Sequence, residues 1–281
     1  MSRLDDVQTS RDFLKLAGLS HARPDSEGLT RLAFEFARLP YENFTKILRA
    51  AEFAEPSRRL RTPEIVLSDH VDMGAGGTCF SLTNFFCGVL AHQGFELYPV
   101  LCDRSYGPDT HCAIVVRMGA QKYLVDPGYL MREPMRVPEA GDSVQRGQRG
   151  LLRLVRLGES RQLVLFSESG GVRKLRYRLK DVPVGEDLFV RRWVESFDWA
   201  MMRHLCASRQ AEQGQVYMRD GRMRRVRAGR GGQVRIDSNF AQEIERNFGI
   251  SRRLVELARD SLTSNKSKRP NRRHEHPALA P

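Results

Sequence analysis

The chain has 281 residues, which at roughly 150 residues per domain predicts two domains or one elaborate domain. Hydrophobic residues make up 41% of the chain and charged residues 28%, an ordinary composition for a folded protein that excludes a disordered one. Lys and Arg outnumber Asp and Glu by 46 to 34, and this net charge of +12 favours anionic ligands without selecting a class of them.

The five cysteines include no Cys-x-x-Cys pair, which argues against a disulfide framework and against a structural zinc site. The first six residues carry two acids and no apolar run, so no signal peptide is expected. No stretch approaches the roughly 18 apolar residues of a membrane span. We therefore expect a cytoplasmic protein with free thiols, no metal and no membrane partner.

Apolar residues repeat at helical spacing through the first third of the chain. Ser10 can cap a helix that Gly18 ends, and a second apolar stripe stops at Pro40. The predicted helices cover residues 10–18, 26–39, 41–53 and 78–94.

After residue 94 the pattern changes to short runs rich in Val, Ile, Leu and Tyr, which favour strands. Hairpin turns are expected at Gly119-Ala120, at Asp220-Gly221 and at residues 229–232, and a polar loop at 139–150. The predicted strands cover residues 96–102, 112–118, 122–125, 151–157, 161–166, 172–179, 215–218, 223–226 and 233–236. The remaining predictions are a helix at 197–207, a helix pair at 240–262 broken at Gly249, and a disordered basic tail at 263–281.

Cys79 follows a glycine-rich segment and comes at the first turn of a predicted helix. Backbone N–H groups and the positive end of the helix dipole favour a thiolate at such a position. The glycines before it would allow a substrate to approach the backbone closely. An ordinary thiol is only a few per cent ionised at neutral pH, so a nucleophilic Cys79 also needs a base nearby.

His111 and Asp126 are suited to complete such a site. They lie nearly equidistant from the turn at Gly119-Ala120, so an antiparallel hairpin brings them close together at one end. Asp126 can then hold one imidazole nitrogen and direct the other towards Cys79, as a Cys-His-Asp nucleophile requires. The hairpin predicts that His111 lies near Asp126. The distance from His111 to Cys79 depends instead on how the helices pack against the strands.

These segments, in this order, resemble the arylamine N-acetyltransferases. Residues 39–44 (Leu-Pro-Tyr-Glu-Asn-Phe) are similar to the P-F-E-N-L signature of that family, and residues 76–80 resemble its nucleophile motif R-G-G-x-C-x-E. His111 and residues 126–129 (Asp-Pro-Gly-Tyr) are similar to its histidine strand and D-x-G-F turn. The likeness covers most of residues 10–262.

The resemblance implies an α+β fold of the papain and transglutaminase type. Its parts would be a helical bundle over residues 1–94, a β-barrel over 95–195 and an α/β lid over 196–262. It also implies ping-pong transfer of an acetyl or other acyl group from acetyl-CoA to an arylamine, a hydrazine or another amine. A thioester on Cys79 would carry the group, with His111 as base and then acid and Asp126 as its orienter.

The resemblance extends to five expected substrate-binding residues. Tyr129 matches the aromatic residue that shapes the acceptor pocket, and Tyr41 matches the Phe of P-F-E-N-L. Gly107 and Thr110 lie where the loop of the family meets the acyl group and CoA, and Gly128 belongs to the turn after Asp126.

The chain departs from the family motif at two positions and is therefore expected to be a divergent member. Ala75 stands where the motif has Arg, and Ser81 stands where it has an acidic or amide residue. The resemblance implies that the missing Arg would have neutralised Glu42. Another arginine, for instance Arg38, is expected to take its place, because a buried carboxylate without a partner is costly.

Three other functions remain open on these residues. An amide synthase would use the same site to acylate or cyclise a different amine, and a transglutaminase- or protease-like enzyme would act on amides without CoA. A catalytically idle basic binding protein would keep Cys79 as a structural thiol, as Cys87, Cys102, Cys112 and Cys206 are expected to be.

Arginines are concentrated in the predicted hairpins at 215–236 and could bind the phosphates of CoA. A solvated strand face is the alternative interpretation of that pattern. The tail has basic residues without interleaved aromatic ones, so no specific nucleic acid partner is expected. The arginines concerned are Arg219, Arg222, Arg224, Arg225, Arg227, Arg230 and Arg235.

Overall fold

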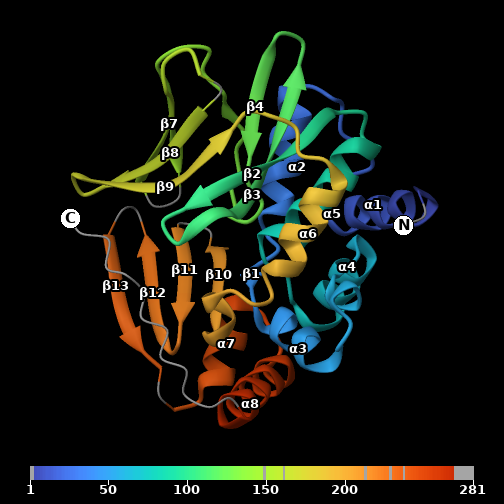
Figure 1. Ribbon diagram of the computed structural model, residues 1–281, viewed down its shortest axis with the longest axis vertical. Helices are drawn as coiled ribbons and strands as arrows, with labels where there is room; N and C mark the ends of the chain where they lie inside the picture. The colour runs from blue at the N-terminus through green and yellow to red at the C-terminus, as the bar shows by residue number, and fades with distance from the viewer. Residues whose placement is uncertain are drawn as a thin grey trace.

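The computed structural model describes residues 3–147, 150–160, 162–211, 214–227, 230–236 and 238–268. Helices α1 to α5 lie on one side of the molecule, and two sheets form the other side, one above the other in the view of Figure 1. Helices α1, α2, α4 and α5 pack together, whereas α3 packs against α8. The helices are α1 (Arg3–Leu16), α2 (Ser26–Phe36), α3 (Phe44–Glu52), η1 (Pro56–Arg59), α4 (Pro63–Met73), α5 (Cys79–His92), α6 (Glu186–Glu195), η2 (Ala200–Arg203), α7 (Phe240–Phe248) and α8 (Arg252–Lys268).

Among the described residues, eight strands form one antiparallel sheet in the order β5-β4-β3-β2-β9-β8-β7-β6. The edge strands β5 and β6 contact each other, so the sheet curls into a nearly closed barrel. These strands are β2 (Glu96–Arg104), β3 (Gly107–Met118), β4 (Gln121–Val125), β5 (Met135–Arg136), β6 (Asp142–Gly147), β7 (Gly150–Arg156), β8 (Gln162–Ser169) and β9 (Val172–Lys180).

The second sheet combines β1, from the first part of the chain, with β10 to β13 from its last part. Its order is β1-β10-β11-β12-β13, and β1 comes from the N-terminal helical segment. Tyr41 of β1 pairs with Ser208 of β10 and forms a parallel bridge with Gly77, two residues before Cys79. The strands are β1 (Tyr41–Glu42), β10 (Cys206–Ala211), β11 (Gly214–Arg219), β12 (Arg222–Arg227) and β13 (Arg230–Arg235).

Helix α5 is the central element of the helical part. Its apolar residues are buried, and Phe85 and Phe86 pack against Phe36 of α2, with the rings of Phe36 and Phe86 stacked at a centroid distance of 4.3 Å. The other side of α5 contacts β2 and β3. Because α5 is held on both sides, its first residue is fixed against the barrel.

The N-terminal helices differ from the sequence predictions in three places. The first helix begins at Arg3 rather than at Ser10, which lies buried inside it. Tyr41 and Glu42 form a strand instead of starting a helix, because they pair with β10, which is remote in sequence. Helix α4 was not predicted; it begins after the cap Thr62, with a proline in its first turn, and ends at Met73, with Gly74 as its C-terminal cap.

The predicted loop at 139–150 is wrong, because β6 pairs there with β7 and closes the barrel. The predicted helix at 197–207 is also wrong: η2 occupies its middle, and β10 begins at Cys206. Helix α6 just before it was missed, although Phe189 and Trp193 lie four residues apart on its buried face. The predicted helix pair divided at Gly249 is confirmed.

The tail predicted to be disordered from residue 263 is helical as far as Lys268, because α8 continues through it. Residues 269–281 of that prediction lie outside the described residues. Within the described part of the chain, no helix is long and apolar enough to cross a membrane.

Candidate active site

Cys79 is the first residue of α5, as the sequence predicts. The cap residue Thr78 makes no side-chain hydrogen bond to the helix, so the backbone N–H groups of the first turn are not taken by a cap. The side chain of Cys79 is 6% exposed and faces a small pocket. Its place at the positive end of the helix dipole favours the thiolate.

The β3–β4 hairpin brings His111 and Asp126 together. The strands turn at residues 119 and 120, and Ile114 pairs with Val125 in the resulting register. Both side chains are buried, and His111 Nε2 lies 2.7 Å from Asp126 Oδ2. The second carboxylate oxygen accepts a hydrogen bond from the backbone N–H of Tyr129 at 2.8 Å, which fixes the carboxylate in place.

The charges of this group favour an ion pair. The pKa of the Cys79 thiol lies well below its ordinary value. Hydrogen bonds from the Cys112 thiol and from His111 lower it, and so do the positive charges of His111 and Lys46. These effects together outweigh burial, which raises the pKa. Burial lowers the pKa of His111, but the carboxylate of Asp126 outweighs it and raises the pKa to about 9. The arrangement therefore supports a thiolate beside an imidazolium at neutral pH.

Gly128 packs directly against these side chains. A Cβ atom on it would lie 2.7 Å from Cys79 Cβ, closer than real Cβ atoms approach, and 3.0 Å from His111 Cε1, a tight contact. Glycine is therefore required for the turn after Asp126 to lie against Cys79. Sequence reasoning placed Gly128 among the substrate-binding residues, and the structure adds this packing role.

Replacing Gly128 by Ala is expected to separate Cys79 from His111 and to slow alkylation of Cys79 by iodoacetamide up to about 10²-fold, the cost of misplacing reacting groups by about 1 Å. Gly88→Ala is the matched control, because it lies in α5 and its added Cβ would meet nothing within 4 Å. Equal alkylation rates in the two variants would contradict the tight packing at Gly128.

The space beside the glycines before Cys79 is occupied by other atoms of the protein. A Cβ on Gly76 would lie 1.8 Å from the carbonyl oxygen of Pro40, and one on Gly77 would lie 2.2 Å from Ser81 Oγ. The expectation that these glycines leave room for a substrate is therefore wrong. They let the segment before α5 lie against Pro40 and β1, with Glu42 N–H donating to the carbonyl of Gly77 at 3.0 Å.

A buried arginine replaces the one that the motif lacks. Glu42 is fully buried, and Arg61 Nη1 lies 3.7 Å from its carboxylate and donates to the carbonyl of Gly76 at 2.7 Å. Arg61 also pairs with Asp69 at 2.8 Å. Burial raises the pKa of Glu42, and Arg61 opposes this effect. Arg38, the expected substitute, is an exposed partner of Glu35 instead.

A wide cleft of about 900 Å³ opens beside the small pocket at Cys79. Tyr41 lines both spaces, Thr110 lines the small pocket, and Gly128 and Tyr129 line the cleft. Gly107 lines neither; its carbonyl accepts a hydrogen bond from Thr110 Oγ1 at 2.7 Å and so positions that residue. Four of the five expected substrate residues therefore lie at one connected space.

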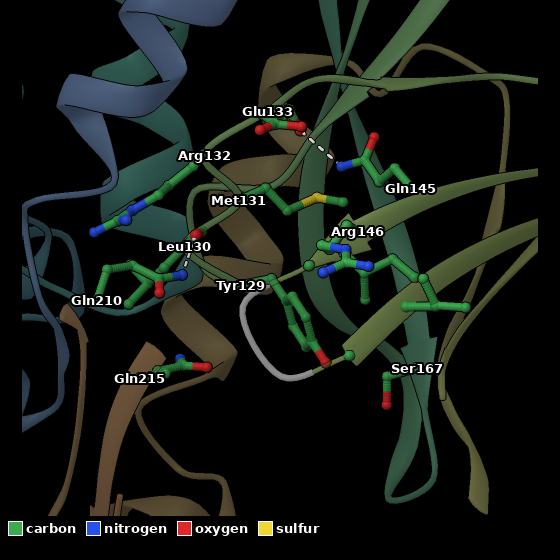
Figure 2. A pocket seen from close by; sticks show the side chains of 14 residues that line it. Tyr129, Leu130, Met131, Arg132, Glu133, Gln145, Arg146, Ser167, Gln210 and Gln215 are labelled. Atoms are coloured by element: carbon green, nitrogen blue, oxygen red, sulfur yellow. Dashed lines mark hydrogen bonds between the residues drawn. The ribbon is translucent and has the colours of Figure 1, made fainter. Parts of the chain in front are cut away.

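Tyr129 also borders a third space, a cavity of about 50 Å³. Figure 2 shows its ring between Gln210 and Gln215 on one side and Arg146 on the other. Gln210 donates to the carbonyl of Leu130 at 2.6 Å, which holds the segment after Tyr129 in place. Tyr129 and Gln215 line the wide cleft as well, so the two spaces adjoin.

Sequence reasoning missed three residues around Cys79. Cys112, which is expected from the sequence to be a structural thiol, lies within hydrogen-bond reach of Cys79 and also faces Thr83 Oγ1 at 3.4 Å. Lys46 is buried beside the same pocket, and its signal was a charged residue next to the apolar positions Phe44 and Ile47 of one helix. Arg61 had no signal, because its partners are remote in sequence.

Within the residues that the structure describes, no three His, Cys, Asp or Glu side chains converge as metal ligands do. The arrangement at Cys79 instead joins a mixed helix and barrel architecture to a buried Cys-His-Asp group. This combination defines a papain-like fold, in which the cysteine begins a helix and the histidine comes from the barrel.

A family model described as N-acetyltransferase matches residues 26–255. The chain belongs to the arylamine N-acetyltransferase family, and it is thus an N-acetyltransferase. A search of curated proteins returned no match.

Solved structures share the fold. The arylamine N-acetyltransferase of Salmonella typhimurium aligns with a TM-score of 0.75 at 18% identity, over 91% of this chain and 98% of that one. The enzyme from Mycobacterium abscessus aligns with a TM-score of 0.76 at 18% identity, over 89% and 93%. The enzyme from Mycobacterium marinum, solved in complex with CoA, aligns with a TM-score of 0.73 at 19% identity, over 90% and 96%.

Proposed function

We propose that the protein transfers an acetyl group from acetyl-CoA to an arylamine or hydrazine by a ping-pong reaction through a thioester on Cys79. The observation that supports this most is the buried hydrogen bond between His111 and Asp126, placed beside a cysteine at the start of a helix. Such a group supplies a thiolate, a proton carrier and its orienter in one place.

In the first half-reaction the Cys79 thiolate attacks the thioester carbonyl of acetyl-CoA. The tetrahedral intermediate breaks its bond to the sulfur of CoA, and imidazolium His111 gives its proton to that leaving group. Acetyl-Cys79, free CoA and neutral His111 remain. Asp126 holds the imidazole so that its other nitrogen faces the reacting sulfur throughout.

In the second half-reaction the amine attacks the acetyl carbonyl of the thioester. Neutral His111 takes a proton from the attacking nitrogen, and the carbon–sulfur bond to Cys79 breaks. The amide leaves, and the thiolate–imidazolium pair is restored. General acid and base assistance of this kind is typically worth about 10² to 10⁴ in rate.

The wide cleft is suited to the CoA part of the donor. Six arginines and a single acid, Asp220, are among the described residues that line it. Phosphates bind well to such a surface, because Arg forms charge-assisted hydrogen bonds with them. Four of these arginines belong to the arginine-rich hairpins predicted at 215–236. The side chains of Arg227 and Arg230, from the same hairpins, are outside the part of the chain that the structure describes. The six are Arg104, Arg176, Arg219, Arg222, Arg224 and Arg235.

Tyr41 and Tyr129 are the proposed walls for the acceptor ring. Both line the cleft near Cys79, and Tyr129 lies under the guanidinium of Arg176 at 5.8 Å from its ring centre. Once CoA has left, the same cleft gives the acceptor access to the thioester. A ping-pong order suits one opening that serves two substrates in turn.

Incubation with acetyl-CoA, without an acceptor, is expected to release one equivalent of CoA and to place one acetyl group on Cys79, as measured by peptide mass spectrometry. Cys79→Ser is expected to show no such adduct, and Cys87→Ser, which changes a thiol of α5 that lines neither the cleft nor the small pocket, should retain it. A protein that forms no adduct with any acyl-CoA, but is labelled at Cys79 by amide substrates, would support the transglutaminase-like alternative. An inert Cys79 would overturn acyl transfer altogether.

A further inference from the structure

The small pocket at Cys79 contains an amine that belongs to the protein itself. Cys79, His111 and Lys46 all line this pocket, which has a volume of about 30 Å³. An engineered cavity that admits benzene measures about 150 Å³, so an aromatic acceptor stays in the wide cleft outside. Lys46 reaches the pocket from α3 and does not line the cleft. Among the described residues that line the pocket, it has the only primary amine.

Lys46 is 8% exposed, and the segment that follows α6 holds its ammonium in place. The ammonium donates to Ser196 Oγ and lies 4.6 Å from the ring centre of Phe197 and 5.8 Å from that of Trp199. Ser196 has one hydroxyl hydrogen, which is directed to the carbonyl of Trp193, so Ser196 accepts from Lys46 and cannot also donate to it. A neutral Lys46 would therefore keep its bond to Ser196 without using its lone pair.

The charge of Lys46 depends on the state of Cys79. Burial lowers the pKa of Lys46 to about 8, and the Cys79 thiolate is the largest of the influences that oppose burial. Weaker influences in the same direction come from Cys112, Cys206 and Asp198. The cationic or titratable neighbours that line the same small spaces as Lys46 are Arg59, Arg61, Arg104 and His111.

Acylation of Cys79 favours the neutral amine. The thioester carries no charge, so its formation removes the anion that helps to keep Lys46 protonated. His111 becomes neutral in the same half-reaction, but it acts on Lys46 less than the thiolate does. The pKa of Lys46 therefore falls below about 8 in the acyl-enzyme, and the fraction of neutral amine at neutral pH rises. A nucleophilic amine and a thioester then lie in one small pocket.

We propose that Lys46 is an internal acyl acceptor, to which the acyl-enzyme transfers its acetyl group from Cys79 when no external amine arrives. The inference rests on the proposed function, since acetyl-Cys79 is the donor. The nitrogen of Lys46 attacks the thioester carbonyl, the carbon–sulfur bond breaks, and the proton that the nitrogen loses passes to His111. The products are Nε-acetyl-Lys46, the Cys79 thiolate and the imidazolium of His111. The step is downhill because an amide is more stable than a thioester.

This modification limits the activity of the chain that carries it. The positive charge of Lys46 lowers the pKa of the Cys79 thiol, and acetylation removes that charge. The freed Cys79 then has a smaller thiolate fraction, and it is the thiolate that reacts. A second equivalent of CoA is therefore released more slowly than the first. A chain without acceptor thus reduces its own consumption of acetyl-CoA.

A pulse–chase experiment on the full chain tests the transfer. The protein is exposed briefly to acetyl-CoA, desalted, and followed by peptide mass spectrometry, with neutral hydroxylamine to cleave thioesters and leave amides. The acetyl group is expected to leave the Cys79 peptide and to appear as an amide on Lys46. Acetylation of Lys46 should exceed that of the exposed Lys174 by at least about 100-fold, because reactants held together have a high effective concentration.

Two variants serve as controls. Cys79→Ser incubated with acetyl-CoA should leave Lys46 unmodified, and Lys46→Arg should retain acetyl-Cys79 for longer, because a guanidinium stays protonated. If acetyl-Cys79 in the unaltered protein lost its group to water and Lys46 stayed unmodified, the inference would be overturned while the proposed function stood. Equal acetylation of Lys46 in Cys79→Ser would also overturn it. A protein that never forms acetyl-Cys79 would overturn the proposed function, and the internal acceptor with it.

Discussion

Replacing Asp126 by Asn is expected to slow the acetylation of Cys79 by roughly 10⁴-fold, the effect of the equivalent change in a Ser-His-Asp triad. One oxygen of this buried carboxylate accepts the N–H of Tyr129, and the other faces His111 Nε2. The amide of Asn would keep its oxygen on the Tyr129 N–H and turn its NH₂ towards His111. The ring nitrogen that faces Asn would then have to accept a hydrogen bond from this NH₂. The single proton of the neutral imidazole would therefore lie on the nitrogen that faces Cys79.

The imidazole would thereby lose its capacity to take a proton from the thiol or the amine. Single-turnover release of CoA from acetyl-CoA measures the effect, and thermal unfolding checks that the variant is folded. Asp187→Asn, an exposed change at the start of α6, is the control and should acylate at the normal rate. A loss smaller than about tenfold in Asp126→Asn would remove the orienting role from Asp126.

Replacing Arg61 by Met is expected to lower the free energy of unfolding by about 3 to 5 kcal/mol, the usual cost of leaving a buried charge unpaired. Glu42 would remain fully buried, with hydrogen bonds from Thr45 and the backbone of Phe44 but no positive charge beside its carboxylate among the partners described for it. The carbonyl of Gly76 would also lose its donor. Denaturation in urea, followed by fluorescence, gives the free energy for each variant.

Two comparisons separate this effect from a general loss of packing. The double variant Arg61→Met with Glu42→Gln should recover much of the stability, because it removes the unpaired charge. Arg38→Met changes an exposed ion pair of the neighbouring segment and should shift stability by no more than about 0.5 kcal/mol. If the double variant were as unstable as Arg61→Met alone, the ion pair with Glu42 would not be the cause.

The parts of the site that depend on local sequence were predictable. A tight turn fixes the register of its hairpin, so the position of Gly119-Ala120 was enough to bring His111 to Asp126. Thr78 before an apolar helical stripe was enough to place Cys79 at the start of α5. Both inferences use contacts made by neighbouring segments of chain.

The parts that depend on distant contacts were not predictable in the same way. Arg61 reaches Glu42 and Gly76 across two helices, and no local pattern distinguishes it from the many other arginines. Lys46 meets Ser196 across 150 positions of sequence. The segment at 197–207 was misread because β10 is made by its pairing with β1 and β11 rather than by its own residues.

The pairing of β1 with β10 has a consequence for synthesis on the ribosome. Tyr41 lies between Ser208 and Gly77, so the strand that steadies the approach to Cys79 has one neighbour encoded far downstream. Translation proceeds from the N-terminus at about 5 to 20 residues per second, so that neighbour emerges on the order of ten seconds after Tyr41. Cys79 therefore emerges before Ser208 and is present in the nascent chain for most of that interval, before the last β-neighbour of Tyr41 arrives.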